Sequence, residues 1–206
     1  MIHTKQLTEA GIPLEEASEA LILLHGRGAI AEDILSLRME LIVSNFYVVA
    51  PQANNNTWYP YSFMAPAHLN EPWLSSAIDL LNEIISDIIK GGILPEKIFL
   101  MGFSQGACLT LEFATRGARK WGGVIAFTGG LIGEVINHEN YAGNFEGTKV
   151  FIGNSDHDPH VPLSRSEESK QVMESLSAEV TLKIYPGMPH IINDDEIEVV
   201  NNLFFL

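Results

Sequence analysis

The pentapeptide Gly102-Phe103-Ser104-Gln105-Gly106 decides the fold of this chain. It follows the apolar run Ile98-Phe99-Leu100-Met101, which is typical of a buried strand, and it precedes residues 107–114, whose composition favours a helix. A strand, a sharp turn at a serine and a helix together form the pattern called a nucleophile elbow. The two glycines lack a Cβ atom, so the chain can turn tightly there. We therefore expect the Ser104 hydroxyl to project from the end of a sheet.

Strand-like apolar runs alternate with helical stretches along the rest of the chain. The runs are continuously apolar, which implies a sheet covered on both faces, and the intervening helices imply parallel crossovers. We expect one domain over residues 1–206 with the α/β-hydrolase fold, a doubly wound, mostly parallel sheet with helices on both faces. Strands are predicted at 21–24, 46–50, 98–103, 124–127, 150–152 and 180–185, helices at 31–43, 72–90, 105–116, 164–175 and 193–205, and a short antiparallel edge strand at 2–8.

The charge balance argues against two classes of partner. The chain has 26 acidic and 12 basic residues, which gives a formal charge of −14. Nucleic acids and anionic membrane surfaces select basic patches, so we expect neither as a partner. The single cysteine, Cys108, cannot form an internal disulfide and is interpreted as a small core residue. No segment has the pattern of a signal peptide or the length of a membrane span, which predicts a cytoplasmic protein.

A serine hydroxyl becomes a good nucleophile when a histidine accepts its proton and a carboxylate orients that histidine. In hydrolases with this elbow, the three residues follow the order serine, acid, histidine along the chain. His190 follows the last predicted strand, in a loop rich in proline and glycine just before the terminal helix. We predict that His190 is the base.

The acid is expected on the loop that follows the predicted strand at 150–152. Two aspartates compete there, Asp156 and Asp158. Asp158 precedes a proline, which favours an extended backbone, whereas the other aspartate would brace the loop. We favour Asp158 and keep Asp156 as the alternative. His157 and His160 are too close in sequence to the acid to act as the base, and we interpret them as loop or rim residues.

The negative oxygen of an acyl-transfer transition state needs preorganised donors. One predicted donor is the backbone N–H of Gln105, directly after the serine. The second is expected from the loop His25-Gly26-Arg27-Gly28, after the first predicted strand, and we assign it to the N–H of Arg27. His25 itself is interpreted as a structural hydrogen-bonding residue.

An aromatic loop follows the predicted strand at 46–50. Trp58, Tyr59 and Phe63 would reach the edge of the sheet where the serine lies, and we predict that they form an apolar wall for an acyl or aryl group. Leu131 is predicted to complete this wall. The alternative is that the aromatic rings anchor a long loop and that Leu131 is ordinary core packing.

Four segments together resemble the phospholipase/carboxylesterase family, which includes the acyl-protein thioesterases. These segments are residues 24–28, 102–106, 158–162 and 185–190, and the resemblance covers the chain from about residue 20 to its end. It implies a Ser104–Asp158–His190 triad, hydrolysis of carboxylic esters or thioesters, and neither a cofactor nor a metal. Arg27 stands where many acyl-protein thioesterases have an apolar residue, the 153–158 loop looks longer than theirs, and the segment 54–63 looks particular to a subset of the family. We therefore expect a carboxylesterase of small esters rather than an enzyme that removes acyl groups from proteins.

The sequence thus predicts a serine carboxylesterase that acts on a small-molecule ester through an acyl-enzyme intermediate. A thioesterase acting on acylated proteins or small thioesters is the alternative within enzymes. An alternative of another class is a hydrolase-fold protein that binds an apolar ligand without catalysis. A homodimer is compatible with the sequence.

Overall fold

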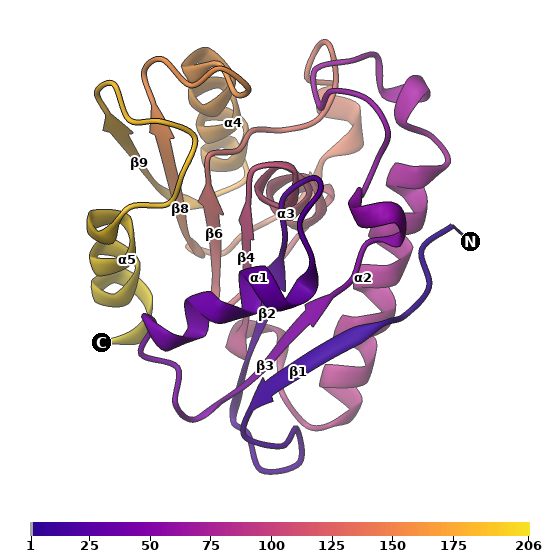
Figure 1. Cartoon of the computed structure of the whole chain (residues 1–206), viewed down its shortest axis with the longest axis vertical. Helices are drawn as coiled ribbons and strands as arrows, with labels where there is room; N and C mark the ends of the chain where they lie inside the picture. The colour runs from indigo at the N-terminus through magenta and orange to yellow at the C-terminus, as the bar shows by residue number, and fades with distance from the viewer. Residues whose placement is uncertain (1) are drawn as a thin grey trace.

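Residues 2–206 are described by the computed structural model, and seven strands in it form one sheet in the order β1-β3-β2-β4-β6-β8-β9 (Figure 1). All neighbouring strands pair in parallel except β1 and β3. The strands are β1 (Leu7–Gly11), β2 (Glu19–Leu24), β3 (Phe46–Pro51), β4 (Ile98–Phe103), β6 (Gly123–Phe127), β8 (Lys149–Ser155) and β9 (Glu179–Tyr185). Two-residue strands β5 (Gly117–Ala118) and β7 (Ala142–Gly143) form a separate parallel pair.

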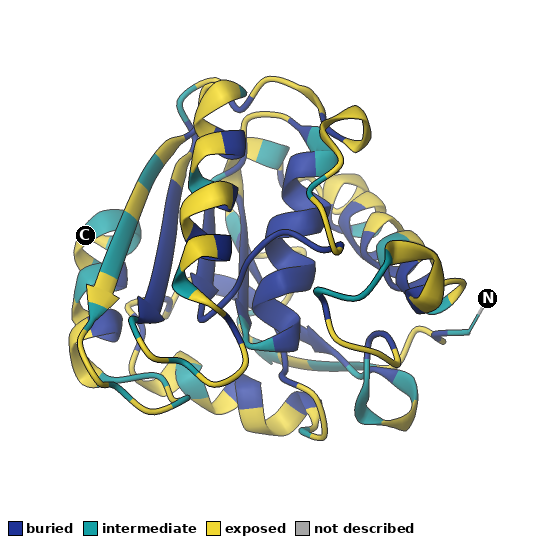
Figure 2. Cartoon of the chain, turned by 90° about the horizontal axis from the view of Figure 1, so that it is seen from above, coloured by how far each residue is buried: buried dark blue, intermediate teal, exposed yellow. Residues whose placement is uncertain are grey.

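Helices cover both faces of the sheet, which confirms the predicted doubly wound arrangement. On one face, alternate side chains of the inner strands pack against α2 (Trp73–Lys90), α3 (Gln105–Arg116) and α4 (Leu163–Ser175). On the other face, α1 (Ala31–Leu35) and α5 (Asp194–Val200) cover the alternate side chains. The central helix α3 is buried along nearly its whole length (Figure 2). The inner strands β2, β3, β4 and β6 therefore need apolar side chains on both faces, which explains their continuous apolar runs, whereas the edge strands β1 and β9 are partly exposed.

The edge strand lies later in the chain than the sequence predicts. An antiparallel strand is present, but it spans Leu7–Gly11, and Leu7 pairs with Pro51 of β3. The preceding residues do not join the sheet, because the backbone N–H groups of Ile2 and His3 both donate to Ser76 Oγ of α2, at 2.8 and 2.9 Å.

Two predicted helices are shorter than the sequence indicates. The stretch at 31–43 contains α1 and then a 3₁₀ turn at Ser36–Met39, and the stretch at 193–205 contains α5 and then a π turn at Asn201–Phe205. Asn201 explains part of this, because its side chain accepts from Ile42 N–H and donates to Glu40 O. These two hydrogen bonds join the residue that follows α5 to the chain that follows the 3₁₀ turn at Ser36–Met39.

The parallel topology brings the loops after β2, β4, β8 and β9 to one edge of the sheet, and in such folds ligands bind at that edge. Among residues 2–206, no helix is both long and apolar enough to cross a membrane.

Candidate active site

Ser104 occupies a strained turn between β4 and α3. Its backbone has φ 55° and ψ −116°, and its N–H donates to Phe127 O of the neighbouring strand at 3.0 Å. A Cβ atom on Gly102 would lie 2.4 Å from Gly106 O, and one on Gly106 would lie 2.1 Å from Leu24 O. Both glycines are therefore required by close backbone approach, and the turn holds the serine at the end of the sheet.

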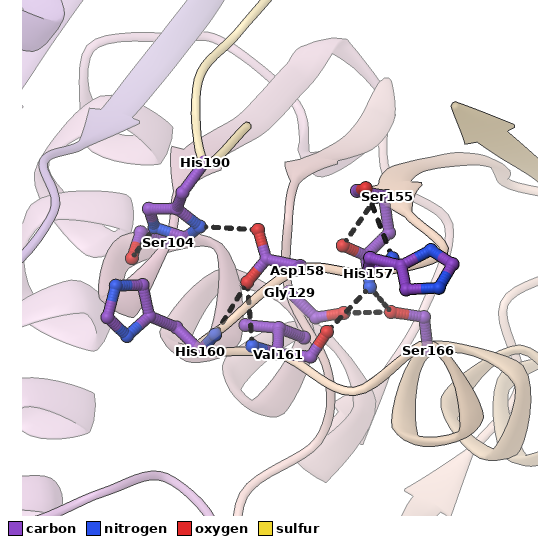
Figure 3. A network of polar contacts seen from close by, with 10 residues as sticks. Ser104, Gly129, Ser155, His157, Asp158, His160, Val161, Ser166 and His190 are labelled. Atoms are coloured by element: carbon purple, nitrogen blue, oxygen red, sulfur yellow. Dashed lines mark hydrogen bonds and ion pairs between the residues drawn. The ribbon is translucent and has the colours of Figure 1, made fainter. Parts of the chain in front are cut away.

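The structure brings together the three side chains that the sequence singles out. His190 Nε2 lies 2.7 Å from Ser104 Oγ, and His190 Nδ1 lies 2.7 Å from Asp158 Oδ2 (Figure 3). Because an ionised carboxylate can only accept, Nδ1 carries the ring proton, and Nε2 accepts from the serine hydroxyl. The arrangement is a continuous hydrogen-bond line from hydroxyl to carboxylate.

Asp158 is held as an acceptor by its own loop. Its side chain is fully buried, and its Oδ1 accepts from the backbone N–H groups of His160 and Val161, both at 2.8 Å. Burial alone would raise the pKa of Asp158, but the hydrogen bonds from His190 and the two amides outweigh it and keep the pKa below its ordinary value. The carboxylate therefore stays ionised and able to orient the imidazole.

A second network fixes the shape of this acid loop. Asn154 Nδ2, at the end of β8, donates to Val161 O at 3.1 Å and to Ser166 Oγ of α4 at 2.9 Å. Ser166 Oγ in turn donates to Gly129 O at 2.8 Å (Figure 3). These buried bonds connect the ends of β6 and β8 to α4 and so determine where the loop places its aspartate.

The alternative acid, Asp156, does not reach His190. Its carboxylate accepts from Gly187 N–H at 2.7 Å and pairs with His157 Nδ1 at 2.8 Å. The amide of Gly187 and the ring of His157 lower its pKa, in that order. Asp156 therefore ties the acid loop to the loop that carries His190. His160 is the other loop histidine, and its ring packs edge-on against His190 with centroids 4.8 Å apart.

The two predicted oxyanion donors belong to different segments, Arg27 to the loop after β2 and Gln105 to α3, of which it is the first residue. Among residues 2–206, the backbone N–H groups of Arg27 and Gln105 have no acceptor in the protein, so both remain available. A Cβ atom on Gly26 would lie 3.5 Å from Ser104 Cβ, which shows how closely the 25–28 loop approaches the serine.

His25 shapes the oxyanion loop and does not reach the serine. It is fully buried, its Nε2 accepts from Ala53 N–H at 3.1 Å, and its Nδ1 therefore donates to Gly26 O at 2.7 Å. Burial lowers the pKa of this histidine, which keeps it neutral.

A cavity of about 610 Å³ opens beside Ser104 and His190. Tyr59 and Phe63 lie on its wall as predicted, next to Tyr61 and Phe103. Its wall also includes Cys108, whose pKa burial raises to about 12, so the thiol is a neutral apolar surface.

Trp58 and Leu131 do not lie on the cavity wall, and here the structure departs from the prediction. Trp58 is fully buried, and its Nε1 donates to His25 O at 2.9 Å beneath the oxyanion loop. Leu131 is also fully buried, and its N–H donates to Ser169 Oγ of α4 at 2.8 Å. Both residues are core packing, and a hydrogen bond satisfies the buried indole N–H of Trp58 and the buried backbone N–H of Leu131.

Sequence reasoning missed the side chain of Gln105. Its Oε1 accepts from Trp58 N–H at 2.9 Å, and its Nε2 donates to Tyr59 O at 2.8 Å. The residue after the serine thus connects the elbow to the aromatic loop. The pentapeptide carries no signal for these bonds, since their partners lie more than 40 positions earlier in the chain.

Within residues 2–206, no group of three or more His, Cys, Asp or Glu side chains is placed to hold a metal ion.

The sheet, the elbow and the residues at the carboxyl edge define an α/β hydrolase. The family model for phospholipase/carboxylesterase matches residues 9–204, and the chain belongs to this family. A crystal structure of a phospholipase/carboxylesterase from Dyadobacter fermentans superposes with a TM-score of 0.98 and 50% identity, covering 100% of this chain and 99% of that one.

Yeast relatives match over a shorter stretch. Acyl-protein thioesterase 1 of Kluyveromyces lactis is 32% identical over 135 residues, covering 64% of this chain and 59% of that protein. Acyl-protein thioesterase 1 of Saccharomyces cerevisiae is 34% identical over 128 residues, covering 60% of this chain and 55% of that protein. The match thus spans less than two thirds of the length of either yeast relative.

Proposed function

We propose that the protein is a serine hydrolase that cleaves carboxylic esters of small molecules through an acyl-enzyme intermediate. The observation that carries the proposal is the line from Ser104 Oγ through His190 to Asp158, with 2.7 Å at each step, at the mouth of a cavity. Membership of the phospholipase/carboxylesterase family supports the same reaction class.

In the acylation step, Ser104 Oγ attacks the ester carbonyl carbon while His190 Nε2 takes the hydroxyl proton. The carbonyl oxygen becomes an oxyanion, and the free N–H groups of Gln105 and Arg27 are its donors. His190 then gives the proton to the alcohol oxygen, the carbon–oxygen bond breaks, and the acyl group remains on Ser104. Asp158 keeps the imidazole in the required tautomer and stabilises its protonated form.

In the deacylation step, His190 removes a proton from a water molecule, and the hydroxide attacks the acyl carbon. Collapse of the second tetrahedral intermediate breaks the bond to Ser104 Oγ, which regains its proton from His190. The carboxylic acid leaves. Besides the ester and one water molecule, these steps use side chains and backbone amides of this chain.

Thioester hydrolysis is the second candidate, and the names of the yeast relatives favour it. The same serine, histidine and donors would serve, with a thiolate as the leaving group. A ligand-binding protein without catalysis is a weaker candidate, because binding alone needs no hydrogen-bonded serine, histidine and carboxylate. Cytoplasmic localisation and a homodimer remain predictions.

Ser104→Ala tests the proposal. The variant should lose turnover of 4-nitrophenyl butyrate by several orders of magnitude and keep its melting temperature, because the hydroxyl contributes to chemistry rather than to the core. Ser175→Ala, whose hydroxyl donates to Val172 O on α4, is the matched control and should keep wild-type turnover. Full activity in Ser104→Ala would refute the proposal, and absence of turnover in the wild-type protein would favour the binding protein. A parallel panel of oxygen esters, thioesters and lysophospholipids separates esterase from thioesterase.

A further inference from the structure

The guanidinium of Arg27 lies on the wall of the active-site cavity and is held there by neutral groups. Nη1 donates to Thr57 Oγ1 at 3.0 Å and to Pro60 O at 2.9 Å, and Nη2 donates to Tyr61 O at 2.6 Å. The guanidinium carbon also sits 5.9 Å from the centre of the Tyr59 ring. These hydrogen bonds fix the position of the guanidinium. Because Arg27 is exposed, its charge still faces solvent.

This cation has no carboxylate partner among residues 2–206. None of the ion pairs in that part of the chain includes Arg27. The acidic residues that follow it in sequence are committed elsewhere, since Glu32 accepts from Thr8 Oγ1 and Asp33 accepts from Ile30 N–H. A guanidinium has five N–H donors, and the three described bonds leave two of them free.

The cavity contrasts with the rest of the surface in its charge. The chain carries a formal charge of −14, yet the cavity wall includes no aspartate or glutamate. The side chains on this wall that can carry a positive charge are Arg27 and the two histidines, His160 and His190. A cleft of one sign on a protein of the opposite sign selects ligands of complementary charge.

The sheet order places Arg27 on the side of the serine away from the proton donor. Ser104 follows β4, the loop with Arg27 follows β2 on one side, and the loops with Asp158 and His190 follow β8 and β9 on the other side. His190 has to protonate the leaving alcohol, so the alcohol departs on the β8 and β9 side. The acyl group then lies on the side of Arg27 and the aromatic loop.

We infer that Arg27 selects esters whose acyl group ends in a carboxylate, that is, monoesters of short dicarboxylic acids. The inference rests on the proposed function and deepens it. One residue supplies both the oxyanion N–H and the guanidinium, so the distance between ester carbonyl and acyl carboxylate is limited to about one arginine side chain. Two free N–H groups of a planar fork match a carboxylate, and a bond of this type is charge-assisted.

The test compares two acyl groups of equal carbon number on one leaving group. The substrates are 4-nitrophenyl hemiglutarate, which is anionic, and 4-nitrophenyl pentanoate, which is neutral, with spontaneous hydrolysis subtracted using Ser104→Ala. The readout is the ratio of kcat/KM for the anionic ester to that for the neutral ester. In Arg27→Gln, which keeps hydrogen-bond donors but loses the charge, the ratio should fall at least about tenfold, mainly through KM, as expected for a lost charge-assisted bond.

Two further measurements keep the inference testable if Arg27→Gln folds poorly. Arg27→Lys keeps the charge without the fork and should show an intermediate ratio. In the wild-type protein, rising NaCl should lower the ratio, because an exposed charge pair is screened. Arg119→Gln is the matched control, since Arg119 is an exposed arginine that packs over Trp121 away from the cavity, and it should leave the ratio unchanged.

The outcomes separate the two proposals. A ratio that is the same in wild type and both Arg27 variants, with equal losses on both esters, would overturn the inference, since Arg27 would then only clamp the aromatic loop. Hydrolysis of the neutral ester would still support the proposed function in that case. If the wild-type protein hydrolyses neither ester, the proposed function itself is contradicted.

Discussion

Asp156 Oδ1 accepts a hydrogen bond from the backbone N–H of Gly187 at 2.7 Å, and this bond joins the loop of the acid to the loop of the histidine. Two positions farther along, Asp158 bonds the imidazole of His190 itself. Neighbouring aspartates on one loop thus have different partners, one on the backbone of the opposite loop and one on its functional side chain. Their substitutions should separate these two roles.

Asp158→Asn should lower kcat for 4-nitrophenyl butyrate by about 10³–10⁴, because an amide stabilises the wrong tautomer of His190 and no longer balances its charge. Asp156→Asn is nearly isosteric and should lower kcat by no more than about tenfold, since only the positioning of the loop changes. Steady-state kinetics with both variants at one pH measures the difference. Equal losses in the two variants would contradict the assignment of Asp158 as the acid.

Gly106→Ala should destabilise the fold, because the new Cβ would lie 2.1 Å from the carbonyl oxygen of Leu24, a backbone atom that cannot move aside cheaply. Overpacking of a core typically costs about 1–3 kcal/mol, and a clash with fixed backbone belongs at the upper end. Gly117→Ala is the control, because its Cβ would meet only the flexible Arg119 side chain, at 3.5 Å. Urea unfolding of both variants checks the prediction, and equal stabilities would show that the elbow tolerates a side chain there.

Gln105→Ala should weaken both stability and turnover. The change leaves the buried Trp58 N–H without its acceptor, whereas Tyr59 O keeps its hydrogen bond from Thr57 Oγ1. An unpaired buried polar group costs about 1–3 kcal/mol. The aromatic loop should then loosen and raise KM. The control is Gln171→Ala, at an exposed position on α4. A wild-type KM in Gln105→Ala would mean that the loop is held by its other contacts.

Glu196→Gln should stabilise the protein at pH 8 and have little effect near pH 4.5. Glu196 is fully buried, its Oε1 has no hydrogen-bond partner, and burial raises its pKa from 4.5 to about 7. Between these values the folded protein holds a proton that the unfolded chain has released, so stability falls as pH rises through this window. The shift corresponds to at most about 3 kcal/mol above pH 7.

Thermal melting across pH 4.5 to 8 checks this prediction. The melting temperature of Glu196→Gln should exceed that of wild type at pH 8, and the two curves should converge toward pH 4.5. Glu198→Gln lies on the same helix at an exposed position and serves as the control. A pH-independent difference between Glu196→Gln and wild type would exclude titration of this carboxyl as the cause.

The central strands and the elbow could be predicted because their signals are local. Continuous apolar runs mark β2, β4 and β6, and the spacing of Gly102, Ser104 and Gly106 defines the turn. The positions of the acid and the histidine followed from chain order, since each has to come after a strand of the same sheet. The choice between Asp156 and Asp158 also had a local basis, the proline at 159.

The cavity wall could not be predicted with the same success, because its contacts are distant in sequence. An aromatic residue looks the same in the sequence whether its ring lines a cavity or packs in the core. Trp58 and Tyr59 are both buried, but only Tyr59 contributes to the cavity wall, while the Trp58 indole donates to His25 O. The burial of Leu131 depends on Ser169, 38 positions later. The predicted position of the edge strand was wrong for a similar reason, because the backbone N–H groups of Ile2 and His3 donate to the distant Ser76 Oγ and not to a strand.

The location of a covalent adduct tests the central claim most directly. After treatment with a fluorophosphonate, peptide mass spectrometry should find one adduct, on the oxygen of Ser104, with esterase activity lost in proportion to labelling and with labelling suppressed in His190→Ala. An adduct on another residue, or esterase activity that persists while Ser104 is fully modified, would contradict the account.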